Sequence, residues 1–280
     1  MDAKLLFIQT LSPLHAGTGQ GVGIIDLPIA REKATQIPFL PGSSIKGVFR
    51  DACGDEQIRH RVFGPAPTTT DLTAGAVTFT DARLLLLPIR SLRGVFAWVT
   101  SPLLLHRLVR DAKNTTASVE LPPSVPSLSS DDACLISSQA VIVMNDKKVI
   151  LEDLPLNAIQ SAEVSAWGDW FAKTVFIEDD QIKELQARLC IVSDDILSFF
   201  LETATEITAR IRIDDNKKTV VDGALWYEEA LPAETVLVSV VVAASHKEEV
   251  FAVAKSISSK TLQFGGKATV GRGLCKTTLV

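Results

Sequence analysis

The order of predicted elements favours an α+β fold, because strand-like and helix-like patterns alternate along the chain. A strand pattern at residues 4–10 is followed by a helical period at residues 43–53 and by further strand patterns. Residues 235–244 are nearly all Val and Ala, which is typical of a strand covered on both faces. A helical pattern at residues 247–258 then leads through a glycine-rich loop to a last strand at residues 274–279. This β-α-β-β-α-β order predicts a ferredoxin-like (RRM-like) unit with large insertions.

The first helix is predicted from the spacing of its apolar residues. These residues share one face of the helix: Ile45, Val48, Phe49 and Ala52. Lys46 and Arg50 are i,i+4 neighbours on the opposite side, where both can reach a phosphate. Ser43 and Ser44 stand at the helix start, so we expect serine caps and N–H groups that can bind an anion. A solvated helix face is the alternative.

The remaining elements follow in chain order. Strands are predicted at residues 77–80, 84–89 and 94–99, with glycine and proline near their ends, and a short helix is predicted at 102–110. Residues 114–132 are rich in Ser and Pro, which predicts an exposed, disordered insertion. Helices are then predicted at 166–175, after residues 179–180, and after residues 194–195. Strands at 208–213 and 219–225, joined by the turn DDNKK, form a hairpin that we expect to project.

Composition excludes several classes of protein. Of the 280 residues, 46% are hydrophobic and 22% are charged, as in a globular chain with a substantial core. The net charge of −5 excludes an unstructured polycationic tail. The apolar runs are too short to cross a bilayer, so we expect a cytoplasmic protein with no membrane partner. The four cysteines are widely spaced and form no CxxC pair, which argues against structural zinc and a disulfide framework.

Charge is unevenly distributed along the chain. Residues 111–235 hold 23 acidic and 10 basic side chains, whereas no acidic residue occurs after position 250. The first fifty residues also lean positive. If the two ends meet in one domain, they form a cationic face suited to phosphate. Scattered, solvated lysines are the alternative.

The glycine-rich loops match no nucleotide-binding motif. In residues 17–23 a glycine stands at every second position, but no window satisfies GxGxxG. Gly266-Lys267 is followed by Ala268, and Thr261 stands where a P-loop needs glycine. A Rossmann fingerprint and a P-loop are therefore excluded. Such loops can bring backbone N–H groups close to an anionic ligand, and plain loop flexibility is the alternative.

Few side chains are candidates for chemistry. Asp26 lies in the first glycine-rich loop, and a single carboxylate can position a hydrated magnesium ion or act on a ribose hydroxyl, although it cannot build a metal cage. Loop capping is the alternative for Asp26. His15 is a candidate contact or acid–base group, or else a structural histidine. Tyr227 and Glu228 follow the predicted hairpin and either touch substrate or simply end a strand.

Taken together, these segments resemble the RAMP superfamily of CRISPR proteins, and within it the repeated backbone subunits of type III-B (Cmr) RNA-guided effector complexes. The segments are SPLHAGTGQGVGIIDLPIARE at 12–32, IPFLPGSSIKGVFRDA at 37–52, GALWYEEALP at 223–232 and LQFGGKATVGRG at 262–273. The resemblance implies a palm with a projecting thumb, polymerised along guide RNA. The charge distribution and the element patterns give a mostly helical acidic insertion at 111–200, and together with the resemblance they give a ferredoxin-like RNA-binding palm at 1–110 and 236–280 and a β-hairpin thumb at 201–235.

The resemblance also implies roles for individual residues. Asp26 matches the aspartate associated in the family with metal-dependent cleavage of target RNA at regular intervals, served by a weakly bound divalent cation, Mg²⁺ or Mn²⁺. Lys46 is expected on the guide backbone. The other expected RNA contacts are His15, Gly17, Gly19, Ser43, Ser44, Arg50, Gly265, Gly266, Lys267 and Arg272. Tyr227 and Glu228 are candidate contacts to the target. The implied partners are guide RNA, single-stranded target RNA, further copies of this chain and the other subunits of a type III-B complex.

Three functions remain open at this point. The leading one is an RNA-guided endoribonuclease subunit in which Asp26 supplies the chemistry. The second is a structural RNA-binding subunit that does no chemistry. The third is a guide-processing endoribonuclease that uses His15 without a metal. A small-molecule enzyme is disfavoured, because no cofactor motif is present.

Overall fold

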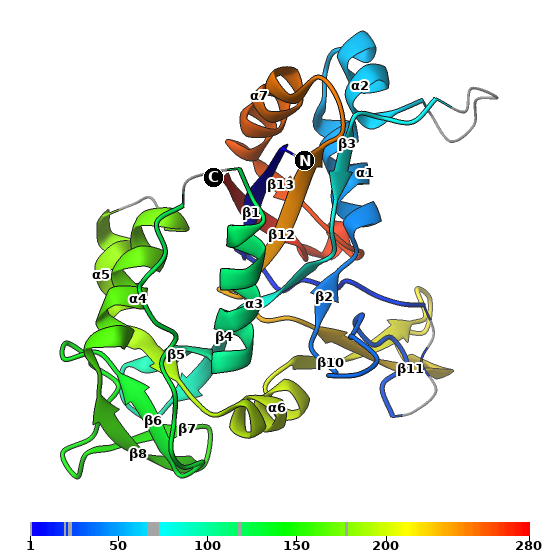
Figure 1. Cartoon of the computed structure of the whole chain (residues 1–280). Coiled ribbons are helices and arrows are strands. Elements are labelled where there is room, and N and C mark those ends of the chain that lie inside the picture. Colours follow the sequence, from blue (N-terminus) through cyan, green and yellow to red (C-terminus); the bar gives the residue numbers. More distant parts are fainter. Residues whose placement is uncertain (1, 20, 22–23, 66–72, 117–118, 177–178) are drawn as a thin grey trace.

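The computed structural model describes residues 2–19, 21, 24–65, 73–116, 119–176 and 179–280. The fold is mixed α/β: a central sheet continues at one end into a closed barrel, and a separate hairpin extends from its side (Figure 1). In the described part of the chain, no helix is long and apolar enough to cross a membrane.

Four long strands form the central sheet: β1 (Asp2–Thr10), β4 (Ala82–Ser91), β12 (Val236–Ala243) and β14 (Leu274–Leu279). Their order is β14-β1-β12-β4, and every neighbouring pair is antiparallel. Three short strands extend this sheet: β2 (Phe39–Leu40), β3 (Val77–Phe79) and β13 (Thr261–Gln263). The pairing of β1 with β14 confirms that the two ends of the chain meet in one sheet.

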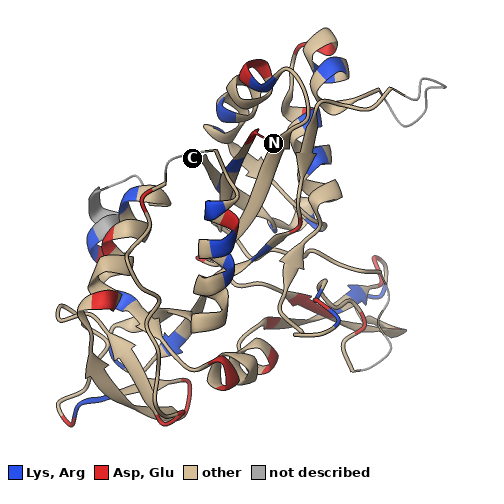
Figure 2. Cartoon of the chain, in the orientation of Figure 1, with Lys and Arg blue, Asp and Glu red and all other residues tan. Residues whose placement is uncertain are grey.

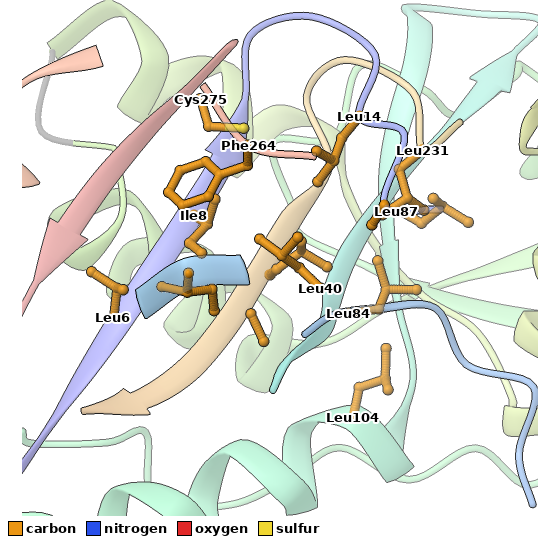
Figure 3. Close-up of a cluster of buried hydrophobic side chains, with 14 of the residues drawn as sticks. Leu6, Ile8, Leu14, Leu40, Leu84, Leu87, Leu104, Leu231, Phe264 and Cys275 are labelled. Atoms are coloured by element: carbon orange, nitrogen blue, oxygen red, sulfur yellow. The ribbon is translucent and has the colours of Figure 1, made fainter. Parts of the chain in front are cut away.

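Helices cover both faces of this sheet. Successive residues of β1 point to opposite sides, so Leu6 and Ile8 join one hydrophobic cluster while Leu5 and Phe7 join another. The first cluster includes apolar residues of α1 (Gly42–Ala52) and α7 (Lys247–Ser258). The helix α3 (Pro102–Lys113) contributes Leu104 to the first cluster and most of its other apolar residues to the second. Figure 3 shows the first cluster, where Ile8 lies beside Phe264. A further short helix, α2 (Glu56–Phe63), was not predicted from the sequence.

The middle of the chain differs most from the sequence prediction, because it is not mostly helical. Strands β5 (Val95–Thr100), β6 (Ala133–Ile136), β7 (Lys148–Leu151), β8 (Leu154–Gln160) and β9 (Leu189–Ile191) close into a six-stranded barrel with β4. The palm boundary predicted at residue 110 is also displaced, since β4 and β5 enter the barrel and α3 continues to Lys113. Strands of three or four residues are too short to show a periodicity.

Helices α4 (Ala162–Thr174), α5 (Asp179–Arg188) and α6 (Asp194–Thr203) confirm the predicted helices of this region. The Ser- and Pro-rich segment, by contrast, is ordered where the structure describes it. Its sparse apolar residues, Val119, Leu121, Val125 and Leu128, pack against the second cluster. The indole N–H of Trp167 also donates to the Ser124 carbonyl at 2.8 Å. A few well-spaced apolar side chains are thus enough to fix a segment of low average hydrophobicity. The ribbon in Figure 2 is coloured for acidic residues on α6 and for basic residues along α3.

The predicted hairpin is confirmed as β10 (Glu206–Ile213) and β11 (Val220–Ala230), a separate two-stranded sheet. The Asp214 carboxylate accepts hydrogen bonds from the N–H groups of Asn216 and Lys217, which fixes the turn. The register pairs Arg210 with Trp226, and Thr208 with Glu228. These four side chains therefore share one face of the hairpin.

Candidate functional site

The loop that carries Asp26 is attached to the root of the hairpin. The Leu27 N–H donates to the Tyr227 carbonyl at 3.1 Å, and the Glu229 N–H donates to the Leu27 carbonyl at 3.0 Å. This loop segment therefore lies parallel to β11 as a short additional strand. Asp26 Oδ2 accepts a 2.8 Å hydrogen bond from the Tyr227 N–H. The position of the Asp26 carboxylate is consequently set by the backbone of β11.

Asp26 opens into a polar cavity of about 480 Å³. Lys267, from the C-terminal glycine-rich loop, lies on the wall of the same cavity. The structure thus brings together two sequence-predicted residues from opposite ends of the chain. The full lining comprises Gly21, Asp26, Leu27, Gly223, Leu225, Trp226 and Lys267.

Glu228 is buried beside this cavity and is surrounded by hydrogen-bond donors. Its Oε1 lies 2.8 Å from Lys267 Nζ and accepts a 2.8 Å hydrogen bond from the Trp226 indole. Its Oε2 accepts a 3.3 Å hydrogen bond from Arg210 Nε. Burial alone would raise the pKa of this carboxyl, but the hydrogen bonds from Lys267 and Trp226 and the two nearby cations lower the pKa to about 2. Glu228 therefore stays ionised at neutral pH and is saturated with partners, which does not fit the predicted contact with target. Tyr227, in contrast, is 37% exposed.

Glu229 secures the other side of the same loop. Its Oε2 accepts a 3.0 Å hydrogen bond from the Ile29 N–H, and its Oε1 accepts one of 3.0 Å from the Thr205 hydroxyl. Arg31 forms a 2.5 Å ion pair with the same Oε1. Since Glu229 is only 3% exposed, these bonds form a buried clamp between the Asp26 loop and β11.

His15 is a buried structural residue. Its Nδ1 donates to the Glu229 carbonyl at 2.6 Å, because a carbonyl can only accept. Two glycines allow the close packing around it: a Cβ at Gly17 would lie 2.5 Å from His15 Nε2, and one at Gly265 would lie 2.4 Å from the His15 carbonyl oxygen. Gly265 also has a φ of +70°. The structure thus favours a structural role for His15 over an RNA contact or an acid–base role.

A second polar hollow, of about 360 Å³, lies between α1 and the two glycine-rich loops. Several sequence-predicted residues meet in its lining, which comprises Ala16, Gly17, Pro41, Ser44, Gly47, Val48, Asp51, Gly265 and Gly266. On α1, Lys46 is half-buried, and burial lowers the pKa of its ammonium. Arg50 Nε donates to the Gly64 carbonyl at 3.4 Å, toward the other end of the helix. Gly19 lies on the exposed part of the first loop.

Two predictions for this region need correction, and both concern partners that are distant in the chain. The α1 N-terminus has no serine cap; instead the Asp81 carboxylate accepts from the Gly42 N–H at 2.8 Å. Ser43 is exposed beside this start and its side chain caps nothing. Arg272 is also buried, and its Nη2 donates to the Thr208 hydroxyl at 3.0 Å. Arg272 therefore joins the C-terminal loop to the hairpin, and we remove it from the expected RNA contacts.

The donor set around Asp26 limits how a metal could bind. Among the described residues, no group of three or more His, Cys, Asp or Glu side chains could hold a metal ion. Asp26 Oδ2 is engaged by Tyr227, and Glu228 is neutralised by Lys267 and Arg210. The site thus fits a hydrated cation that takes one protein carboxylate oxygen and otherwise relies on substrate and water.

Sequence reasoning missed two residues of this site, Trp226 and Arg210. The available signal was the alternation along β11, which places Trp226 on the same face as Glu228. The pairing of Arg210 with Trp226 would have followed from the hairpin register.

Comparisons with known proteins agree with this architecture over the whole chain. The model of the RAMP superfamily matches residues 7–276. The chain is 34% identical to the CRISPR system Cmr endoribonuclease Cmr4 of Pyrococcus furiosus over 298 aligned positions, which cover 100% of this chain and 96% of that protein. The crystal structure of oligomeric Cmr4 from Pyrococcus furiosus matches with a TM-score of 0.79 and 30% identity, covering 100% of this chain and 98% of that one. A type III-B Cmr-beta cryo-EM structure bound to cognate target RNA shares the fold, with a TM-score of 0.75, 23% identity and coverage of 100% and 97%. The chain therefore belongs to the RAMP superfamily and, within it, to the Cmr4 family.

Proposed function

We propose that this chain is the backbone subunit of a type III-B CRISPR complex, that its copies assemble along guide RNA, and that it cleaves complementary target RNA at regular intervals. The observation that carries this proposal is the cavity in which Asp26 and Lys267 meet at the root of the hairpin. The name of the Pyrococcus furiosus relative, an endoribonuclease, supports the activity. The oligomeric crystal structure and the RNA-bound complex support the assembly and the ligand.

The central sheet and the separate hairpin correspond to the palm and the thumb that the proposed function requires. The β14-β1-β12-β4 sheet, with α1 and α7 on one face, has the connectivity of a ferredoxin-like palm, and the β10–β11 hairpin is the thumb. The hollow beside α1 offers glycine backbone and a hydroxyl to a phosphate chain, and Lys46 stands on the same helix. Guide RNA would follow this hollow, while target RNA would reach Asp26 at the thumb root. Contact with the other subunits of the complex forms part of the same proposal.

Asp26 would act through its exposed carboxylate. The Tyr227 N–H holds Oδ2, and within the described residues Oδ1 has no hydrogen-bond partner. Oδ1 could accept a hydrogen bond from a ribose hydroxyl or from a water held by a divalent cation. A weakly bound Mg²⁺ or Mn²⁺ would supply charge neutralisation at the scissile phosphate, with RNA oxygens and water completing its ligands.

The experiment that tests this function compares wild-type and Asp26→Asn chains in complexes assembled on the same guide. Cleavage of labelled complementary RNA is followed with Mg²⁺ or Mn²⁺ and with EDTA, at target concentrations that saturate both complexes. We expect equal target affinity, a loss of cutting of at least 100-fold in the variant, and no cutting in EDTA, because asparagine keeps the shape but removes the charge.

The alternatives give different results in the same assay. Full cutting by Asp26→Asn would refute the assignment of Asp26. A wild-type complex that binds target but never cuts it would identify the structural subunit. Cleavage that persists in EDTA and disappears in His15→Ala would favour the metal-independent endoribonuclease, although the burial of His15 speaks against it.

A further inference from the structure

We propose that Lys267 is a further catalytic residue of this site, whose ammonium stabilises the negative charge that develops on the scissile phosphate beside Asp26. This inference rests on the proposed function, since it requires cleavage at Asp26. It assigns Lys267 a role in the rate of the chemical step, beyond a contact that only adds affinity for RNA.

The position of the ammonium supports this role. Lys267 lines the same cavity as Asp26, and its side chain is 33% exposed. Its Nζ lies 2.8 Å from Glu228 Oε1, and a lysine ammonium has three N–H groups to donate. A phosphate that enters the cavity next to Asp26 can turn its oxygens toward the Lys267 ammonium on the wall, and this ammonium can then stabilise negative charge on those oxygens.

The backbone at Lys267 adopts a conformation that is unusual for a lysine. Its φ is +67°, in the left-handed region that L side chains rarely adopt. The same loop uses glycine at other positions of this kind, with φ +70° at Gly265 and +80° at Gly271 and Gly273. Glycine would therefore suit the backbone at position 267 better than lysine. Seven other non-glycine residues among those described also have a positive φ, so this conformation assigns no function by itself, and the position of the ammonium in the cavity carries the inference.

Glu228 is then a positioning residue. Its carboxylate fixes Lys267, while Trp226 and Arg210 fix the carboxylate in turn. Because the pKa of Glu228 is about 2, this carboxylate remains ionised at neutral pH and pairs with the Lys267 ammonium. It is unsuited to proton transfer near neutral pH. The network thus prepares a fixed positive charge before RNA binds.

The chemistry requires such a charge. When an RNA phosphodiester is cleaved, the attacking oxygen forms one P–O bond and loses a proton, while the bond to the leaving oxygen breaks and that oxygen gains a proton. The phosphorane between these states carries more negative charge on its non-bridging oxygens than the starting diester. Lys267 would stabilise that charge, form no covalent bond and keep its proton throughout.

The test uses Lys267→Gly, which removes the ammonium and suits the local backbone. Complexes are assembled on guide RNA, and single-turnover cutting is measured with saturating labelled target and Mg²⁺. We expect a rate at least 100-fold lower, a target affinity within about twofold of wild type, and a lower melting temperature, because the buried Glu228 carboxylate loses its ion-pair partner. Lys267→Arg should keep the rate within about tenfold, because it keeps the charge.

Lys147→Gly is the matched control, since Lys147 is an exposed lysine with φ +60° on the barrel. It should cut at the wild-type rate. Wild-type cutting by Lys267→Gly at saturating target would overturn the inference, as would a defect confined to target affinity. If Lys267→Gly melts at a lower temperature, the cutting rates of Lys267→Met and Lys267→Arg are compared instead. Slow cutting in Lys267→Met alone supports a role for the positive charge, and equal cutting rates in these two variants refute that role. An Asp26→Asn arm separates this inference from the assignment on which it rests, because full cutting there refutes the role of Asp26, whereas a wild-type complex that binds target and never cuts it refutes the function itself.

Discussion

Replacing Glu228 by glutamine should destabilise the protein in a pH-dependent way. The substitution keeps the side-chain shape and an acceptor for the Trp226 indole, but removes the charge that pairs with Lys267 and Arg210. The pKa of this carboxyl is lowered from 4.5 to about 2 on folding. At about 1.4 kcal/mol per tenfold change in acidity, the ionised form contributes roughly 3 kcal/mol of folding free energy.

The sign of the pH dependence follows from the lowered pKa. Because the folded protein holds this proton less tightly than the unfolded chain, the contribution is complete above about pH 5 and is lost as the pH falls toward 2. At about pH 3.5, a substantial part of this contribution, on the order of 1 kcal/mol, should already be lost. Urea unfolding at about pH 7 and about pH 3.5 should therefore show a smaller difference between wild type and Glu228→Gln at the lower pH.

The control for this measurement is Glu202→Gln, which changes an exposed carboxylate on α6 outside the network. Its free energy of unfolding should differ little from wild type at either pH. A difference between wild type and Glu228→Gln that is the same at both pH values would refute the reasoning, because the stabilisation would then not come from the ionised carboxylate.

Two further predictions concern RNA binding and the hairpin. Lys46→Ala should weaken guide binding for every sequence and lower the salt slope in a binding titration by about 1; adding Arg50→Ala should weaken it further, and Lys173→Ala on α4 should not. A slope unchanged in both Lys46 variants would remove α1 from the RNA site. Replacing the turn, residues 214–218, by Asn-Gly should shift the melting temperature by less than about 3 °C while target cutting falls, because this turn is exposed. Loss of the circular dichroism signal would show that the hairpin tip is part of the core.

The elements that could be predicted from the sequence are those whose apolar residues recur over a long stretch. The helix α1 and the strand β12 each follow a pattern that local chemistry imposes wherever the chain lies. The hairpin was predictable for the same reason, because its turn residues lie between two alternating segments. Asp26 could be selected because it is the acidic residue of a glycine-rich loop, and the family resemblance supplied its expected role.

The barrel required the tertiary structure. Strands as short as Leu189–Ile191 are stabilised by neighbours far away in the chain, and β9 pairs with β5 in parallel and with β6 in antiparallel. No local period distinguishes three apolar residues in a strand from three in a helix. The ordered Ser- and Pro-rich segment has the same explanation, since its few apolar residues are fixed only by the cluster that they meet.

The sequence by itself determined which residues are charged and where glycine permits unusual backbone conformations. Only the tertiary structure decided which of the charged side chains can contact a ligand. Lys267 and Arg272 look equivalent in the sequence, yet one lines a cavity and the other is buried against Thr208. Asp26 is positioned by the backbone of Tyr227, which lies more than half of the chain away. Glu228 has a low pKa because Lys267, from the C-terminal glycine-rich loop, pairs with it. Burial and pairing depend on distances between segments, and those distances are set only when the sheet, the loops and the hairpin have packed together.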